Sequence, residues 1–108
     1  MRNWRKNILD KYDVKLLEKA YRNLDEIYTY IANEILAPET ARNQLDRLKG
    51  AILGLDTFPN AHQDRLAGFY ADKGYKQLIV DNYIAIFRVD EEEKKVYVVT
   101  VQYMGRNL

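Results

Sequence analysis

The chain has 108 residues, 47% of them hydrophobic, and its 17 Lys and Arg against 16 Asp and Glu leave a formal net charge of +1. This length and apolar content indicate one compact domain with a core, and they exclude wholesale disorder and a pair of ordinary domains. The balanced charge does not indicate a general nucleic-acid binder, although it is compatible with a local basic patch.

Because the sequence contains no cysteine, disulfides, thiolate zinc sites and cysteine nucleophiles are excluded, and a reducing compartment fits this absence. No apolar run approaches the roughly 20 residues that span a bilayer. The opening sequence MRNWRKNILDKYD is basic but has no apolar segment of the kind found in secretory signals. We therefore expect a cytoplasmic protein with no membrane partner.

The first part of the chain predicts an arm, a strand and a helix. Residues 1–10 show no steady period and are expected to form an N-terminal arm before a domain over residues 11–108. Alternation of polar and apolar residues over 11–16 predicts a half-buried strand. From Glu18 to about Leu36 apolar residues recur at helical spacing. They are Ala20, Leu24, Ile27, Ile31 and Ile35.

Pro38 separates this helix from a second one, because proline disfavours helical geometry in the residue before it and suits the first turn of a helix. The second helix is predicted to end near Gly54 and the TFPN stretch that follows. Its apolar stripe consists of Ala41, Leu45, Leu48, Ile52 and Leu55. Two amphipathic helices with so short a link must turn back on each other as an antiparallel hairpin.

The remainder of the chain predicts a loop over 61–74 and then three strands. The strand candidates are 75–80, 83–89 and 96–104, and the second of them is apolar enough to be covered on both faces. The turns between them are short, so these strands form an antiparallel meander, which the first strand joins at an edge or at the centre. The predicted class is α+β: an antiparallel helix hairpin packed on one face of a small, mainly antiparallel four-stranded sheet (β-α-α-β-β-β).

Four stretches of the sequence resemble, in order and spacing, the RelE/ParE superfamily of toxins from bacterial type II toxin–antitoxin pairs. They are LDEIYTYIA (24–32), ILGLDTFP (52–59), GYKQLIVDNY (74–83) and QYMGRN (102–107). No single piece is diagnostic, but four in register make the likeness fairly specific. The resemblance implies a compact toxin held inactive by a cognate antitoxin. Its target is either mRNA on the ribosome or DNA gyrase, because relatives divide between the two.

The resemblance to the mRNA-cleaving members implies a set of catalytic residues. Metal-free cleavage of RNA needs a base for the 2′-hydroxyl, cations for the phosphate and an acid for the leaving oxygen. Lys76, Tyr103 and Arg106 match positions at which such relatives carry catalytic residues. Arg65 and Arg88 are further cations for substrate binding, since a guanidinium fits a phosphate with a planar fork of donors. The enzyme implied is a metal-independent endoribonuclease.

Departures from that pattern keep the other target open. Ile84 stands where relatives resembling RelE carry an arginine, and Leu78 replaces a second lysine. Residues 65–108 also hold almost as many acidic as basic side chains, whereas a ribosome-binding surface favours cations. The sequence slightly favours an mRNA interferase, and the alternative is a ParE-like, non-catalytic inhibitor of gyrase. A toxin that has lost its activity and persists as an antitoxin partner is a third hypothesis.

A cognate antitoxin is the partner expected under each hypothesis. It would lay a helix or strand in the groove between the helix hairpin and the sheet, or cover the C-terminal cations. Tyr21, Tyr28 and Tyr30 on the hairpin offer aromatic anchors of the type enriched at interface centres. No cofactor or metal site is expected, since the single histidine, His62, is interpreted as a solvent-facing loop residue.

Overall fold

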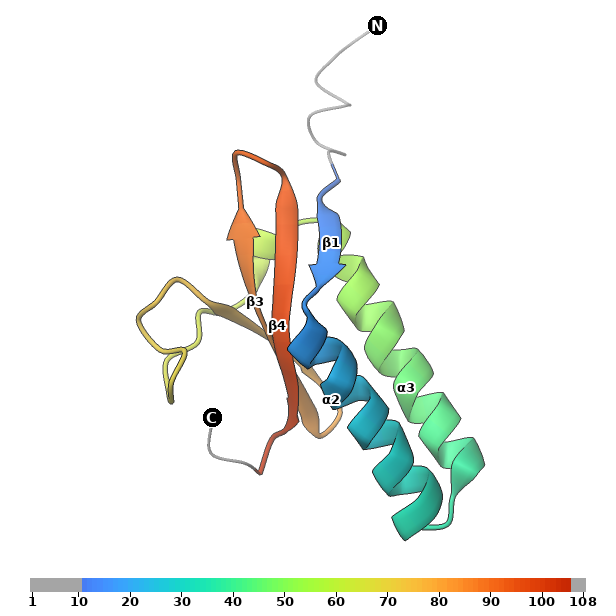
Figure 1. Cartoon of the computed structure of the whole chain (residues 1–108). Helices are drawn as coiled ribbons and strands as arrows, with labels where there is room; N and C mark the ends of the chain where they lie inside the picture. The colour runs from blue at the N-terminus through green and yellow to red at the C-terminus, as the bar shows by residue number, and fades with distance from the viewer. Residues whose placement is uncertain (1–10, 106–108) are drawn as a thin grey trace, which may run out of the picture.

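The structure is a computed structural model that describes residues 11–105, in which two helices pack on one face of a four-stranded sheet (Figure 1). The strands are β1 (Asp13–Leu16), β2 (Lys76–Val80), β3 (Tyr83–Asp90) and β4 (Lys95–Tyr103), and the helices are α2 (Glu18–Thr29) and α3 (Pro38–Leu53). The predicted α+β class and element order are confirmed. The predicted N-terminal arm, residues 1–10, lies outside the described range.

The sheet has the strand order β1-β4-β3-β2. β2, β3 and β4 pair antiparallel through short turns, whereas β1 is parallel to β4, from Asp13 opposite Lys95 to Leu16 opposite Val98. A parallel neighbour requires a long crossover connection, and the two helices belong to that connection. The first strand therefore lies at an edge, which decides between the two positions that the sequence allowed.

The first helix changes its winding before it ends. One π-helical turn spans Tyr30–Glu34, and the backbone NH of Ile35 donates to the carbonyl of Tyr30 at 3.2 Å. This wider turn rotates the residues after it away from the apolar stripe. As a result Ile35, predicted to face the core, is 54% exposed. Leu36 then takes a left-handed conformation with φ 59°, and Pro38 opens α3 as predicted.

The hydrophobic core lies between the helices and one face of the sheet. Its buried members are Ala20, Leu24, Leu48, Ile52, Leu55, Ala85, Phe87, Val96, Val98 and Val101. Every residue of the stripe predicted for the second helix is buried or half-buried, so that stripe is confirmed. Ile84 and Ile86 alternate with the core-facing residues of β3 and are buried as well, which confirms that this strand is covered on both faces.

A bulge interrupts the pairing of β3 with β4. Ile86 lies opposite Thr100 and Phe87 lies opposite Val98, which leaves Val99 as an extra residue in β4. A bulge of this kind bends its strand and increases the local twist. It divides β4 into a first half, next to β1, and a second half that runs to Tyr103 beyond the end of β1.

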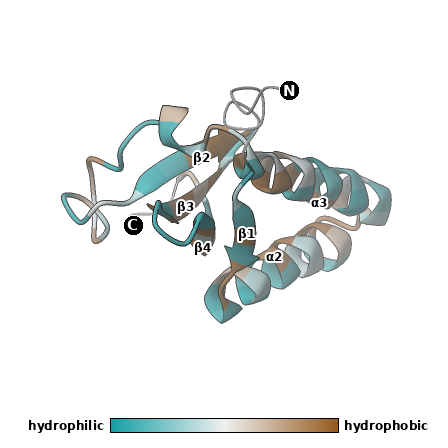
Figure 2. Ribbon diagram, turned by 90° about the horizontal axis from the view of Figure 1, so that it is seen from above, coloured by the Kyte–Doolittle hydropathy of each residue, from teal (hydrophilic) through white to brown (hydrophobic). Residues whose placement is uncertain are grey.

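The segment before β2 projects away from the helices, as Figures 1 and 2 both show. In Figure 2 hydrophilic and hydrophobic stretches alternate along both helices, as expected of helices with one face on a core. At the start of the segment, the ring of His62 packs edge-on against Phe87, with 5.8 Å between the ring centroids. The prediction that His62 faces solvent is therefore wrong: its half-buried ring contacts the core.

Exposed polar contacts join the turn between β2 and β3 to α3. Asp81, in the turn between β2 and β3, has φ 55°, the left-handed geometry of a tight hairpin turn. Its carboxylate accepts hydrogen bonds from Arg47 at 2.8 Å and Gln44 at 2.9 Å, both on α3. These donors, Arg47 first, hold the pKa of Asp81 below its ordinary value of 3.8.

Candidate functional site

Lys76, the first of the predicted catalytic residues, is held in a contact with its own loop. It begins β2, and its ammonium donates to Asp64 Oδ1 at 2.8 Å and to the backbone carbonyl of His62 at 3.2 Å. Only 20% of the Lys76 side chain is exposed. Its position opposite Phe87 places it on the core face of the sheet. Its charge is therefore already partnered.

Tyr103 lies at the other end of the strands. It is opposite Tyr83, which is in turn opposite Val80 at the end of β2. Lys76 and Val80 are four residues apart on β2, which at about 3.3 Å per residue is about 13 Å along the sheet. The structure does not bring Lys76 and Tyr103 together. Arg106, the third predicted catalytic residue, lies outside the described residues.

The two predicted substrate-binding arginines make local contacts. Arg65 donates to the carbonyl of Ala67 at 2.8 Å and to the side chain of Gln77 at 3.1 Å. Arg88 lies over the ring of Tyr97 on β4, 4.3 Å from the ring centroid. Because Arg88 follows the core-facing Phe87 in β3, it lies on the opposite face of the sheet from Lys76. These cations do not converge with Lys76 on one site.

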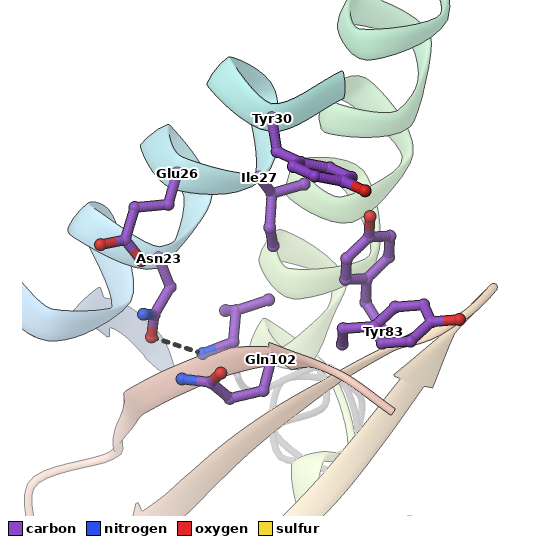
Figure 3. A pocket seen from close by; sticks show the side chains of 8 residues that line it. Asn23, Glu26, Ile27, Tyr30, Tyr83 and Gln102 are labelled. Atoms are coloured by element: carbon purple, nitrogen blue, oxygen red, sulfur yellow. Dashed lines mark hydrogen bonds between the residues drawn. The ribbon is translucent and has the colours of Figure 1, made fainter. Parts of the chain in front are cut away.

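A cavity of about 720 Å³ lies between the first helix and the C-terminal half of β4 (Figure 3). Asn23, Glu26, Ile27 and Tyr30 line it from the helix and its π-helical turn. Tyr83, Val101, Gln102 and Tyr103 line it from β3 and β4. Its lining combines apolar groups, three phenols, two amides and one carboxylate.

The phenol groups dominate the outer end of this cavity. The rings of Tyr83 and Tyr103 pack edge-on with 5.8 Å between centroids, and 57% of Tyr30 is exposed. Burial, with Tyr103 and Tyr30 nearby, raises the pKa of Tyr83 above its ordinary value of 10.0. The shift makes the Tyr83 hydroxyl harder to deprotonate, which does not favour it as a general base.

Asn23 fixes the inner end of the cavity. Its side-chain oxygen accepts hydrogen bonds from the Thr100 hydroxyl at 2.7 Å and from the backbone NH of Val101 at 3.0 Å, the latter drawn in Figure 3. The amide of Gln102 donates to the same Thr100 oxygen at 2.9 Å. Asn23 thus replaces the neighbouring strand that β4 lacks beyond Val98, and it satisfies buried polar groups there.

Sequence reasoning missed Asn23, although a signal for it exists. Asn23 is three residues after Ala20 and one before Leu24, so helical spacing places it beside the buried stripe. A polar residue at such a position needs a partner inside the protein. Tyr83 and Gln102 carry no comparable signal, because their place at the cavity depends on strand register.

A second groove, of about 580 Å³, lies between α2 and α3. Its lining is mainly apolar, with one acid and one base: Leu16, Tyr21, Leu24, Asp25, Tyr28, Leu45, Lys49, Ile52 and Leu53. The predicted strip of three tyrosines is therefore divided between two hollows. Tyr21 and Tyr28 line the groove between the helices, while Tyr30 lines the cavity beside β4.

Within residues 11–105, no three His, Cys, Asp or Glu side chains are grouped closely enough to hold a metal ion. In the same range, no helix is long and apolar enough to span a bilayer.

Comparisons with known proteins agree on one kind of protein. The family described as the ParE toxin of type II toxin–antitoxin system, parDE, matches residues 14–108. The chain is similar in structure to a protein of the chromosomal ParDE toxin–antitoxin system of Pseudomonas aeruginosa, with a TM-score of 0.72 and 21% identity over 87% of this chain and 97% of that one.

The chain is also similar to a protein of the RelBE2 toxin–antitoxin complex of Mycobacterium tuberculosis, with a TM-score of 0.63 and 20% identity over 86% of this chain and 91% of that one. No curated protein matches it. The structural likenesses show a shared fold, and the family match extends over nearly the whole chain. The chain belongs to the ParE toxin family and is a toxin of a type II toxin–antitoxin system.

Proposed function

We propose that this toxin arrests growth by binding DNA gyrase and not by cutting RNA. The observation that carries the proposal is the separation of Lys76 from Tyr103, which is about 13 Å along the sheet at about 3.3 Å per strand residue. Groups that transfer protons at one phosphate must each come within about 2.6–3.2 Å of the reacting atoms. Membership of the ParE family supports the same choice over the interferase that the sequence slightly favours.

The partners of the predicted cations support a non-catalytic role. A phosphate at Lys76 would have to displace the Asp64 carboxylate, 2.8 Å from the ammonium. Arg88 is stacked on Tyr97, and Arg65 is bonded to its own loop. An inhibitor that acts by contact requires none of these groups to be free. Its requirement is a surface complementary to the target.

The cavity beside β4 is the proposed binding site of the antitoxin. The exposed rings of Tyr30 and Tyr103 are aromatic anchors of the type that carry binding energy in interfaces. Glu26 adds one carboxylate to the lining, which would pair with a basic side chain of the partner. Because β4 continues past the end of β1, an antitoxin segment would lie in the cavity between its C-terminal half and the first helix.

A supercoiling assay with purified gyrase and the purified toxin tests the proposal. Mapping of mRNA 5′ ends in a translating extract tests the alternative, cleavage of mRNA. We expect supercoiling to be inhibited while translated messages remain intact. Lys76→Ala and Tyr103→Phe should inhibit as strongly as the unaltered protein. New cuts that occur only in translated messages and disappear with Tyr103→Phe would overturn the proposal in favour of an interferase.

A further inference from the structure

The loop before β2 is a closed hairpin-like projection. Backbone hydrogen bonds join its two arms: Arg65 NH donates to the Tyr75 carbonyl at 2.8 Å, and Gln77 NH donates to the Gln63 carbonyl at 2.9 Å. An antiparallel bridge between Asp64 and Lys76 lies between these bonds. Residues 66–74 form the part beyond this paired base, which we call the tip. It projects away from the helices (Figures 1 and 2).

Contacts within the tip, and one with Tyr75 at its base, fix its shape. Tyr70 packs edge-on against Phe69 and Tyr75, with centroid distances of 5.1 and 5.0 Å. The ammonium of Lys73 lies 3.6 Å from the centroid of the Phe69 ring. Gly68 has φ 80° and begins a turn, in which its carbonyl accepts a hydrogen bond from Ala71 NH at 3.2 Å. The tip therefore presents its side chains from a preorganised backbone.

Two large apolar side chains of this tip face solvent. Leu66 is 81% exposed and Phe69 is 68% exposed. The two side chains are three residues apart on one projecting segment, and exposed apolar surface that is grouped in this way is typical of protein interaction sites. Aromatic and aliphatic anchors of this kind lose little conformational freedom when they enter a pocket.

We propose that the tip is the surface by which the toxin docks onto its target protein, with Leu66 and Phe69 inserted together into an apolar cleft. A protein fits better than a nucleic acid for two reasons. Leu66 has no flat face on which a base could stack. The charges of the tip also balance, because Asp72 offsets Lys73, which leaves little attraction for a phosphate backbone.

The position of the tip separates it from the proposed antitoxin site. The tip extends from the β2 edge of the sheet, whereas the cavity lies beside β4, and β3 stands between the two strands. Docking of the tip into the groove of a second copy would join two different surfaces, and such contacts propagate into open assemblies unless a ring closes.

The inference rests on the proposed function in that it takes the target to be a protein.

The test compares Leu66→Ser/Phe69→Ser with the control Leu36→Ser/Phe58→Ser. The control residues are of the same types and are similarly exposed, at 80% and 61%, but lie elsewhere. Each variant is induced without antitoxin and compared at equal expression. We expect the tip variant to raise colony survival at least tenfold, while its thermal unfolding and its antitoxin binding stay unchanged. The control should arrest growth fully. Growth arrest by the tip variant equal to that of the unaltered protein would overturn the proposal.

The single variants and the gyrase assay separate the remaining outcomes. A protein cleft predicts that Leu66→Ser and Phe69→Ser each weaken growth arrest, whereas loss with Phe69→Ser alone would indicate base stacking and overturn the proposal. Concentration-dependent assembly in sedimentation that the double variant abolishes would assign the tip to a second copy and also overturn it. If the unaltered toxin leaves gyrase active and both single variants weaken arrest, the proposed function fails while the docking surface stands.

Discussion

Beyond the end of β1, the second half of β4 forms one edge of the sheet and β2 forms the other, and these two edges are built in opposite ways. Beside β4 a recessed cavity is held by Asn23, whose hydrogen bonds to Thr100 and Val101 are buried. Beside β2 a projecting hairpin is joined by an ion pair between Lys76 and the largely exposed Asp64. Removing one partner of a buried hydrogen bond leaves the other without water, while an exposed ion pair contributes little. The two edges should therefore respond very differently to substitution.

Asn23→Ala should produce the largest effect. It removes the acceptor of two buried donors, and each donor left unsatisfied costs about 1–3 kcal/mol, so the free energy of unfolding should fall by about 2–6 kcal/mol. Urea unfolding followed by circular dichroism measures this. Asn43→Ala, at an exposed position of α3, is the control and should change stability by less than about 0.5 kcal/mol. An equally small loss for Asn23→Ala would contradict the contrast between the edges.

Residues of the cavity beside β4 should also contribute most of the free energy of antitoxin binding. Tyr30→Ala is expected to weaken the affinity for the antitoxin by about 30-fold, which corresponds to about 2 kcal/mol for an aromatic anchor. Tyr21→Ala is the matched control, because Tyr21 is similarly exposed, at 62% against 57%, but lines the other groove. Titration calorimetry with the antitoxin compares the two. A larger loss for Tyr21→Ala would move the proposed antitoxin site to the groove between the helices.

The turn between β2 and β3 allows a test by pH. Because the folded state holds the pKa of Asp81 below 3.8, its pairing with Arg47 stabilises the protein above that pH and is lost as the pH falls through the lowered value. Thermal unfolding at neutral pH and near pH 3 should show a smaller acid-induced loss for Asp81→Asn than for the unaltered protein. Arg47→Ala should reduce the loss in the same way. Identical pH profiles for all three would show that this contact contributes nothing.

Asp64→Asn should produce the smallest effect. It leaves Lys76 without its charged partner, but the ammonium keeps its hydrogen bond to the His62 carbonyl, and the asparagine amide oxygen can still accept from it at a position that is 70% exposed. We expect a change in unfolding free energy of about 0.5 kcal/mol or less. Raising the salt concentration should abolish the difference from the unaltered protein. A loss that matches the one for Asn23→Ala would show that both edges are held with equal strength.

Much of the fold follows from local patterns in the sequence. The helical stripe from Ala41 to Leu55 and the short turns between the last strands leave little freedom in the architecture. The π-helical turn at Tyr30–Glu34 carries no such pattern, because no residue in it breaks a helix. It was therefore missed, and with it the exposure of Ile35.

The candidate site was harder to predict because it depends on pairing between distant residues. The tight turn at Asp81 places Lys76 opposite Phe87, which the sequence alone could have indicated. The position of Tyr103 depends on the turn between β3 and β4 and on the bulge, neither of which leaves a clear local signal. Motif likeness placed Lys76 and Tyr103 in one site, whereas strand register separates them.

The extra residue in β4 also changes which sequence positions face the core. Before Val99 the core-facing positions of β4 are even-numbered, as at Val98, and after it they are odd-numbered, as at Val101. With unbroken pairing from Val98 onward, Gln102 would lie opposite Tyr83 in place of Tyr103. The aromatic pair of the cavity thus exists because one strand uses two registers. Deleting Val99 would remove the bulge and leave Tyr103 opposite Tyr83 in one continuous register.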